Sequence, residues 1–432
     1  MVDDMFNEDF GNPFKPGAGH MPPYLAGRKT EQNEFRSLLA QKVILKNMIL
    51  TGLRGVGKTV LLQTLKPIAL KTGWFWVGTD LSETSSLKEE NIATRLLSDL
   101  ALATSSLVLR SVESRKVGFN ESAYVGEATP YGGADTTQVN VTLDYRTLQQ
   151  IYHDTPGLAS DKLKRVLEIV AHVLCNGDRR GIVFAYDEAQ NLADHASKEQ
   201  YPLSLLLDVF QSIQRKEIPF MLVLTGLPTL HAKLVDARTY SERMFHIVEL
   251  RKLSKEQCRE AILYPIQEEG CPVQFNETSV DLIIETSGGY PYFIQFICRE
   301  VYDVFIQKRS AGEEMRVPIA EIINKLDSDF SSGRWSRATD RQRELLTVIA
   351  TLESCDDEFT AVEVAQASRK VLRRGFTPSH VSQVFAALCQ AGLVYKNRHG
   401  KYCYAVPLLG DFIKRQEPYH IIRGAKTDRS ID

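Results

Sequence analysis

Residues 48–62 read MILTGLRGVGKTVLL, and this stretch decides the fold class. An apolar run over 47–52 breaks into glycines and a Lys-Thr pair, after which apolar residues return at helical spacing. The segment from Gly52 to Thr59 matches the pattern G-x-x-x-x-G-K-[ST]. A buried strand, a glycine-rich turn and a helix in this order predict the first element of a parallel α/β sheet.

The residue types in this turn suit a phosphate group. Glycines let the backbone wrap a phosphate with its N–H groups pointing inward, the lysine reaches the β- and γ-phosphates, and the threonine hydroxyl binds Mg²⁺. The complete motif between strand and helix disfavours the alternative of a glycine-rich turn with an incidental lysine. We therefore expect ATP and Mg²⁺ as cofactors, with Thr59 as a metal ligand and nucleotide contacts from Gly52, Gly55, Val56, Gly57, Lys58 and Thr59.

Further apolar runs alternate with helical patterns along the first 250 residues. Continuous apolar runs are typical of parallel strands that helices cover on both faces. They predict strands at 47–52, 74–80, 181–187, 219–226 and 246–250. Helical spacing predicts helices at 58–70, 87–111, 159–176 and 200–215. The polar, glycine-rich interval 119–145 is expected to be an insertion, either a hairpin or a mobile loop.

The strand in GIVFAYDEAQ ends in two carboxylates. After a P-loop, Asp187 is expected to bind Mg²⁺, directly or through water, and Glu188 to activate the attacking water. An Asp that caps a helix beside a solvated Glu would be the plainer interpretation of this pair in isolation. The upstream phosphate motif favours the catalytic one, and a Glu at this position favours hydrolysis over nucleotide binding alone.

Two later positions extend this site. Thr225, at the tip of the 219–226 strand, is a candidate to hydrogen-bond the water or the γ-phosphate, although turn residues commonly occupy strand ends. Arg243 is a candidate to reach the γ-phosphate of a neighbouring subunit and stabilise transition-state charge. Arg238 competes for that role, and a solvated arginine near a helix end is the plainer alternative for both.

Composition limits the class of protein. The chain has 432 residues, of which 43% are hydrophobic, so two or three domains with substantial cores are expected. A net charge of −2 restricts any nucleic-acid contact to a local patch. The seven cysteines lack metal-ligand spacing, which predicts reduced, mostly buried thiols in a cytoplasmic protein. The sequence contains neither a signal peptide nor an apolar run of the ~18 residues that a membrane span needs.

The order of these motifs resembles that of AAA+ ATPases, over residues 24 to about 415. LAGRKTEQNEF at 25–35 is similar to the GRxxE box that these proteins carry before the P-loop, which implies that Tyr24, Leu25 and Arg28 lie near the adenine. The likeness is strongest to the prokaryotic branch related to origin-recognition initiators and to STAND signalling ATPases. It implies an αβα core followed by a helical lid.

The lid carries a departure from the family pattern. LRKLSKEQCREAILYPIQEEG resembles the entry into the lid, and GGYPYFIQ at 288–295 resembles its GxP element, which implies a nucleotide contact by Pro291. Many AAA+ proteins have a lid arginine that touches the γ-phosphate, whereas the matching positions here are Gly289, Tyr290 and Pro291. This difference points toward the STAND-like side of the family.

The last unit resembles a winged helix-turn-helix. Three helical patterns precede LVYKNRHGKYCYAV, which alternates around a His-Gly turn as a β-hairpin does. Thr377 and Pro378 are expected to open its third helix. The groove-facing side would then carry Ser379, His380 and Gln383, the wing Lys396, Arg398 and Lys401, and the nearby surface Lys370, Arg373 and Arg374. A module that only packs or binds protein is the alternative.

Together these observations predict an α/β fold, a three-layer αβα P-loop sheet with a helical lid and a C-terminal winged helix. Residues 1–23 are rich in Gly and Pro and are expected to form a flexible, extended and poorly packed arm. The other expected domains are the ATPase core at 24–252, the lid at 253–310, a linker at 311–333, the winged helix at 334–415 and a tail at 416–432. We expect an ATP-hydrolysing switch that couples nucleotide state to binding of duplex DNA, with a homo-oligomer or a protein partner and no membrane. The alternatives are a STAND-like signalling or defence ATPase and a transposition-type targeting ATPase.

Overall fold

The computed structural model describes residues 11–105, 107–116, 119–124, 136–175, 179–267, 271–312, 316–398 and 400–416. The chain forms two compact units. The sheet unit comprises 28–51 and 58–249, and the C-terminal unit comprises 250–432 together with 1–27 and the turn 52–57.

A parallel sheet of five strands forms the centre of the sheet unit. Its strand order is β2-β6-β7-β1-β8. The predicted strands are confirmed at five places, with ends that differ by a few residues: β1 Asn47–Thr51, β2 Trp74–Val77, β6 Gly181–Tyr186, β7 Phe220–Gly226 and β8 Phe245–Glu249. The central strands β1, β6 and β7 are buried along their whole length, which explains their uninterrupted apolar sequences.

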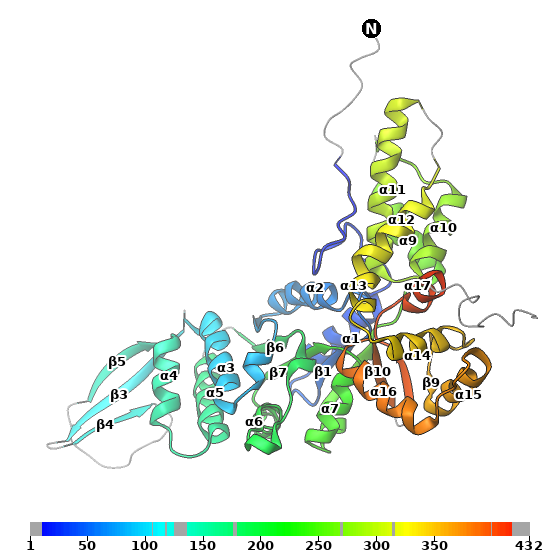
Figure 1. Cartoon of the computed structure of the whole chain (residues 1–432). Helices are drawn as coiled ribbons and strands as arrows, with labels where there is room; N and C mark the ends of the chain where they lie inside the picture. Colours follow the sequence, from blue (N-terminus) through cyan, green and yellow to red (C-terminus); the bar gives the residue numbers. More distant parts are fainter. Residues whose placement is uncertain are drawn as a thin grey trace, which may run out of the picture. The chain divides into compact units, whose positions relative to one another are not determined.

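Helices cover both faces of this sheet. The connection β1-α2-β2 crosses the sheet in one direction and β6-α6-β7 returns in the other, so right-handed crossovers place α2 and α6 on opposite faces. Figure 1 shows α2 on one side of β6 and β7 and α6 on the other. The helices of this layer and its surroundings are α1 Lys29–Leu39, α2 Lys58–Lys71, α3 Glu89–Thr104, α5 Ala159–Cys175, α6 Pro202–Arg215, α7 Thr229–Ala237 and α8 Ser241–Met244.

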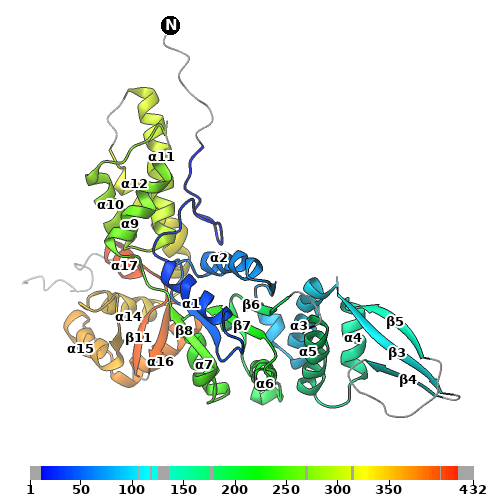
Figure 2. The ribbon, with the colours of Figure 1, turned by 180° about the vertical axis from the view of Figure 1, so that it is seen from behind.

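The insertion is larger and more regular than a hairpin. It forms a three-stranded antiparallel sheet of order β4-β3-β5, with β3 Val108–Lys116, β4 Phe119–Tyr124 and β5 Thr136–Thr142. The prediction of helix to residue 111 is wrong, since α3 ends at Thr104 and β3 follows. A further helix, α4 Tyr145–Asp154, lies beside this sheet in both views (Figures 1 and 2). Residues 125–135 of the predicted insertion lie outside the described residues.

The lid helices belong to the C-terminal unit. They are α9 Lys255–Leu263, α10 Glu277–Ser287, α11 Pro291–Ala311 and α12 Ile319–Leu326, followed by a π-helix at Asp327–Ser332. The predicted linker therefore contains two helical elements. The described part of the arm differs from the expected loose segment, because Phe14 is fully buried and its ring lies 6.2 Å from that of Phe275. Burial of this aromatic side chain stabilises the segment, although its Gly- and Pro-rich composition predicted little packing.

The end of the chain has the expected winged-helix elements. Three helices, α14 Asp340–Ala350, α15 Ala361–Val371 and α16 Pro378–Gln390, share one apolar core with the sheet β10-β11-β9. The strands are β9 Phe359–Thr360, β10 Val394–Arg398 and β11 Lys401–Tyr404. Thr377 caps α16 as predicted, since its hydroxyl accepts a hydrogen bond from the His380 N–H. The sequence pattern did not predict the last helix, α17 Leu409–Gln416.

Cysteine burial agrees with the sequence. Among the cysteines whose side chains the structure describes, Cys258, Cys298, Cys355 and Cys403 are buried, Cys271 and Cys389 are partly buried, and all six are free thiols. No helix in the described part of the chain is both long and apolar enough to cross a membrane.

Candidate nucleotide-binding site

The glycine turn follows β1 directly. Gly55 and Gly57 have φ angles of 79° and 88°, which L side chains rarely adopt. A Cβ at Gly57 would meet nothing within 4 Å, so this glycine is required for its backbone conformation and not for space. The Gly55 carbonyl accepts a hydrogen bond of 3.1 Å from the N–H of Tyr292, at the start of α11. The glycines of the motif thus stand where the turn needs positive φ angles, which only glycine adopts at a low cost in free energy.

Thr59 and Asp187 come together in the sheet unit. Thr59 lies in the first turn of α2, and its hydroxyl donates a hydrogen bond of 2.5 Å to Asp187 Oδ2, although 128 residues separate them. Parallel strands bring the carboxyl ends of β1 and β6 to the same edge of the sheet, which explains the contact. The structure therefore joins the two residues that the sequence predicted as metal ligands.

Asp187 is a buried carboxylate. Only 4% of its surface is exposed. Burial raises the pKa of this carboxyl group, the hydrogen bonds from Thr59 and from the Glu188 N–H oppose that effect, and the neighbouring Glu188 and Asp80 carboxylates add to it. A hydroxyl and a carboxylate oxygen are donors of the kind that Mg²⁺ prefers, and Mg²⁺ in phosphate sites commonly takes only one or two protein ligands. The residues present fit this ion.

Glu188 has an unusual backbone. Its φ angle is 51°, in the left-handed region that side-chain-bearing residues seldom occupy. Its N–H donates a hydrogen bond of 2.8 Å to Asp187 Oδ1, and its side chain is exposed. Such conformations cost about 1–3 kcal/mol and concentrate at functional sites. The strained residue is the one that the sequence selected as the general base.

Thr225 occupies the carboxyl end of β7. It pairs with Leu50 of β1 and is fully buried. Its hydroxyl has no hydrogen-bond partner among the residues that the structure describes. A buried hydroxyl without a partner costs stability, and the role of this side chain toward a nucleotide stays a prediction.

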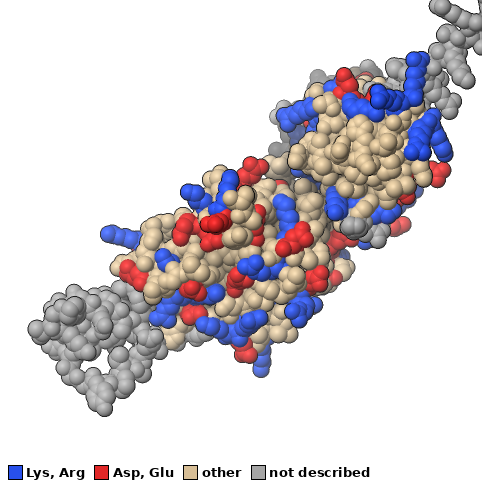
Figure 3. Space-filling view, turned by 60° about the horizontal axis from the view of Figure 1, so that its bottom comes forward, with Lys and Arg blue, Asp and Glu red and all other residues tan. Residues whose placement is uncertain are grey.

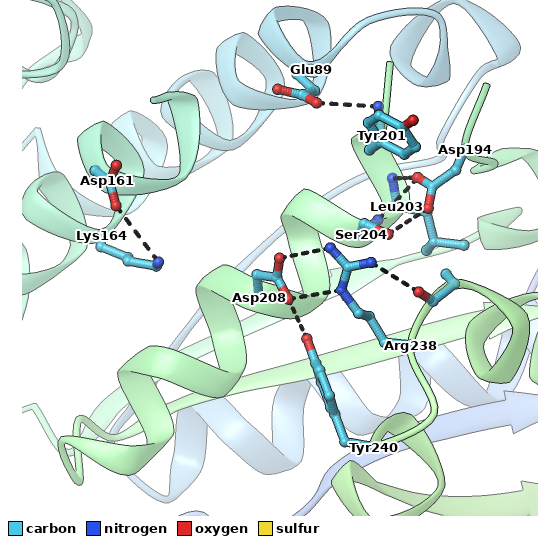
Figure 4. Close-up of polar contacts among 11 residues, drawn as sticks. Glu89, Asp161, Lys164, Asp194, Tyr201, Leu203, Ser204, Asp208, Arg238 and Tyr240 are labelled. Atoms are coloured by element: carbon cyan, nitrogen blue, oxygen red, sulfur yellow. Dashed lines mark hydrogen bonds and ion pairs between the residues drawn. The ribbon is translucent and has the colours of Figure 1, made fainter. Parts of the chain in front are cut away.

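The two candidate arginines differ sharply. Arg238 donates two hydrogen bonds, of 3.1 and 3.0 Å, to the carboxylate of Asp208, and the Tyr240 hydroxyl also donates one to it (Figure 4). Burial alone would raise the pKa of Asp208, but Arg238 and Tyr240 hold it below its usual value. Arg243 is exposed, and its side chain forms no ion pair with any described residue. Of the two, Arg243 keeps its guanidinium available.

The residues expected near the adenine have other contacts. Tyr24 donates a hydrogen bond of 3.2 Å to Glu260, and its ring centroid lies 4.5 Å from that of Tyr264. Leu25 is partly buried, and Arg28 is buried and lies 3.4 Å from Glu31. Pro291 is the first residue of α11, next to Tyr292, whose N–H reaches the P-loop. Their roles toward a nucleotide stay predictions.

Two residues near Glu188 were missed. Gln190 and Lys233 both hydrogen-bond within the loop that carries Glu188. Gln190 stands in the quoted DEAQ stretch, so proximity in sequence was an available signal. Nothing local distinguishes Lys233, which lies on α7 and is one of several polar residues there.

The three helices and the hairpin near the end of the chain present a second candidate surface. On α16, Ser379 and Gln383 are exposed, but His380 is half-buried with its ring 5.1 Å from that of Phe376. On the wing, Lys396 is exposed and Lys401 lies 4.0 Å from Glu363, whereas the side chain of Arg398 lies outside the described part of the structure. Figure 3 shows a tan area on the upper-right part of the molecule with Lys and Arg side chains around its edge and few acidic ones among them.

Two family models match parts of this chain. Residues 24–224, which include the P-loop, Asp187 and Glu188, match the family described as "AAA ATPase domain". This region is similar to AAA ATPase domains. The resemblance predicted from the motifs is thereby confirmed. Residues 328–413 match a second family, described as "Domain of unknown function (DUF8462)". No curated protein matches the chain.

Several solved structures are similar to this chain at low sequence identity. The Orc1 protein of Aeropyrum pernix, solved in complex with DNA, is 15% identical, with 93% of this chain and 95% of that chain covered and a TM-score of 0.43. Cdc6p of Pyrobaculum aerophilum is 13% identical, with coverage of 93% and 96% and a TM-score of 0.44. AMPPCP-bound DnaA of Aquifex aeolicus is 12% identical, with coverage of 85% and 90% and a TM-score of 0.37.

Proposed function

We propose that this chain binds and hydrolyses ATP with the help of Mg²⁺ and uses the nucleotide state as a switch. The observation that carries the proposal is the contact between Thr59 and Asp187, 2.5 Å apart, with strained Glu188 next in the chain. A phosphate-binding motif, a metal-ligand pair and a carboxylate base make up the parts of a hydrolytic P-loop site.

The phosphates are held by the turn and the first residues of α2. The backbone N–H groups of Gly55, Val56 and Gly57 and the ammonium of Lys58 neutralise phosphate charge, and the N-terminus of α2 adds a favourable dipole. When bound, Mg²⁺ supplies positive charge to the β- and γ-phosphate oxygens. Thr59 and Asp187 would hold that ion.

Proton transfer falls to Glu188. Its carboxylate accepts a proton from the attacking water, and Thr225, whose buried hydroxyl lacks a described partner, orients the water or the γ-phosphate. Phosphate release from ATP, measured with and without Mg²⁺, tests the proposal directly. Turnover that requires Mg²⁺ supports it, whereas absence of turnover under both conditions rejects hydrolysis.

We further propose that Arg243 acts on a nucleotide bound by a neighbouring subunit. Its exposure and lack of an ion pair with described residues favour it over Arg238, which Asp208 already engages. Arg243→Ala should lower ATP hydrolysis by about 1,000-fold while nucleotide affinity stays within about twofold, since such arginines stabilise transition-state charge. Mixing this variant with Lys58→Ala protein should restore part of the turnover, because each supplies the group that the other lacks.

The matched control for this experiment is Arg215→Ala, at the end of α6 in the same unit. It removes the same charge and should leave turnover unchanged. Complementation that fails, with Arg243→Ala still inactive, would mean that Arg243 acts within its own chain. Wild-type turnover by Arg243→Ala alone would remove the residue from the site.

For the C-terminal unit we propose binding of duplex DNA through the winged helix. The exposed Ser379 and Gln383 on α16 would face the groove, and Lys396, Arg398 and Lys401 on the wing would contact phosphates. The small number of basic groups suits a local patch on a chain of net charge −2. Contact between the winged helix and a protein, as in a signalling ATPase, is the competing function.

Replacing Lys396, Arg398 and Lys401 together by alanine separates these functions. Each phosphate that a basic side chain neutralises releases condensed counterions, so DNA affinity falls as salt concentration rises. In a plot of the logarithm of affinity against the logarithm of salt concentration, the slope should become less steep by about 0.9 for each side chain removed, or roughly three for the triple variant. Binding should weaken to a similar degree on every duplex sequence. Fluorescence anisotropy of a labelled duplex across a salt series, with and without ATP, measures both effects.

A triple variant of three exposed lysines in or beside the lid, Lys252, Lys255 and Lys325, changes the net charge equally and serves as the control. It should keep the wild-type slope. Gln383→Ala should instead alter the preference among duplex sequences if this side chain reaches base edges. An unchanged slope in the wing variant would remove the wing from the interface, and no DNA binding by the intact protein would favour the protein-contact function.

A further inference from the structure

Gln190 spans the distance between the proposed base and the neighbouring strand. Its side-chain Nε2 donates a hydrogen bond to the Glu188 carboxylate, and its Oε1 accepts one of 3.0 Å from the N–H of Leu227, directly after β7. With the amide turned over, Oε1 would face the Glu188 carboxylate, placing two acceptors together. The NH₂ group would then face the N–H of Leu227, placing two donors together. Chemistry therefore allows only this orientation.

Gly226 makes room for this side chain. A Cβ at Gly226 would lie 2.7 Å from Gln190 Oε1 and 3.3 Å from the Gln190 backbone N. The φ angle of Gly226 is not in the left-handed region, so its backbone conformation does not demand glycine. The absence of a side chain at the end of β7 is explained by the close approach of Gln190.

The loop that holds Gln190 is fixed from other sides as well. Lys233 on α7 donates a hydrogen bond of 2.5 Å to the Gln190 carbonyl, and burial lowers the pKa of this half-buried lysine. Asn191 Nδ2 donates one of 2.8 Å to the Leu81 carbonyl. With its backbone held by α7 and by the segment after β2, the loop has little freedom to move Gln190 away from Glu188.

We propose that Gln190 is a positioning residue for Glu188, an inference that rests on the proposed role of Glu188 as the base. Strand β7 lies between β6 and β1 in the sheet, so a carboxylate tied to the exit of β7 is directed toward the strand that leads into the P-loop. Thr225 lies on the same strand, two residues before Leu227. The amide thereby aligns the base with the hydroxyl proposed to orient the water.

The hydrogen bond leaves the base able to act. An ionised carboxylate has about four lone-pair sites, and the contact with Gln190 occupies one of them. Small displacements of a catalytic group reduce rates strongly, by up to ~100-fold for a shift of about 1 Å. A fixed orientation should therefore accelerate hydrolysis, whereas an amide that held Glu188 away from the water would slow it.

Gln190→Ala tests the sign of this effect. The variant should lower kcat by at least about tenfold, with KM and the affinity for ATP within about twofold of wild type. Gln190→Glu should lose at least as much, because it keeps the shape but replaces the donor with a second carboxylate beside Glu188. Gly226→Ala should resemble Gln190→Ala, since its Cβ displaces Oε1.

A double variant separates positioning from a general structural role. In the Glu188→Gln background, Gln190→Ala should cause no further loss, because the group it positions is already absent. Gln200→Ala, which removes another glutamine hydrogen bond in the same unit, is the control and should leave kcat unchanged. Thermal melting of each variant reports whether the fold is intact.

Wild-type or faster turnover by Gln190→Ala would overturn the inference, as would a further loss in the Glu188→Gln background. If Glu188→Gln is inactive while Gln190→Ala turns over normally, only the role of Gln190 is wrong. If Glu188→Gln itself hydrolyses ATP at the wild-type rate, the assignment of the base fails, and the role of Gln190 fails with it.

Discussion

Lys58→Ala is expected to weaken ATP binding by at least about 100-fold. The ammonium group should contact the phosphate oxygens, each hydrogen bond to a charged group contributes about 1.5–3 kcal/mol, and every ~1.4 kcal/mol changes affinity about tenfold. The remaining turn still offers its backbone N–H groups, so some weak binding of nucleotide should persist at high concentration. Titration with a fluorescent ATP analogue, or calorimetry, measures the change.

The same helix supplies a control for this prediction. Lys66 is an exposed lysine on α2, two turns beyond Lys58, and Lys66→Ala removes an equal charge from the same element. Its affinity for ATP should stay within about twofold of wild type, because screened charges beyond a Debye length of ~10 Å interact weakly. Retained affinity in Lys58→Ala would show that the turn binds phosphate without its lysine, contrary to the proposed site.

Glu188→Gln is expected to abolish turnover while ATP stays bound. Glutamine keeps the length and planarity of the side chain but cannot accept a proton, so hydrolysis should fall by about 100- to 10,000-fold, the range typical of a missing general base. ATP affinity should remain close to that of the wild type. Single-turnover hydrolysis of radiolabelled ATP, together with equilibrium binding, distinguishes the two quantities.

Glu199→Gln is a matched control, because it removes the same negative charge at a residue with a similar backbone conformation. Glu199 is exposed and has a φ angle of 52°, close to the 51° of Glu188, and it lies in the same unit. Its replacement should leave hydrolysis unchanged. If both variants were equally inactive, the loss could not be assigned to the missing carboxylate of Glu188.

The sequence pattern alone leaves two arginines as candidates to reach a neighbouring γ-phosphate, and the exposure of their side chains distinguishes them. Arg238 and Arg243 lie five residues apart, and both follow the helix after β7. The structure gives Arg238 a carboxylate partner in Asp208, on a helix 30 residues earlier, and leaves Arg243 exposed. Asp208 lies on α6, far from both arginines in sequence. Only the packing of α6 against residues 237–240 therefore shows which of the two guanidinium groups binds this carboxylate.

Much of the fold follows from local features of the chain. The strands β1, β6 and β7 are buried on both sides, so their apolar runs are uninterrupted and easy to recognise. The three-stranded sheet of the insertion was harder to predict. Strand β3 reads VLRSVESRK, which carries polar and charged residues and lacks the apolar alternation that marks a half-buried strand, whereas β5 reads TTQVNVT and alternates only over a short piece.

The sequence by itself determined the turn from Gly52 to Thr59, because its residues are consecutive and its glycines are needed for their own backbone angles. It also determined the carboxylate pair, which ends an apolar strand. Only the tertiary structure decided how these parts meet. The contact of Thr59 with Asp187 crosses 128 residues, and that of Gln190 with Leu227 crosses 37. Such contacts depend on strand order and on which side chains share one edge of a sheet, and no local periodicity encodes either property.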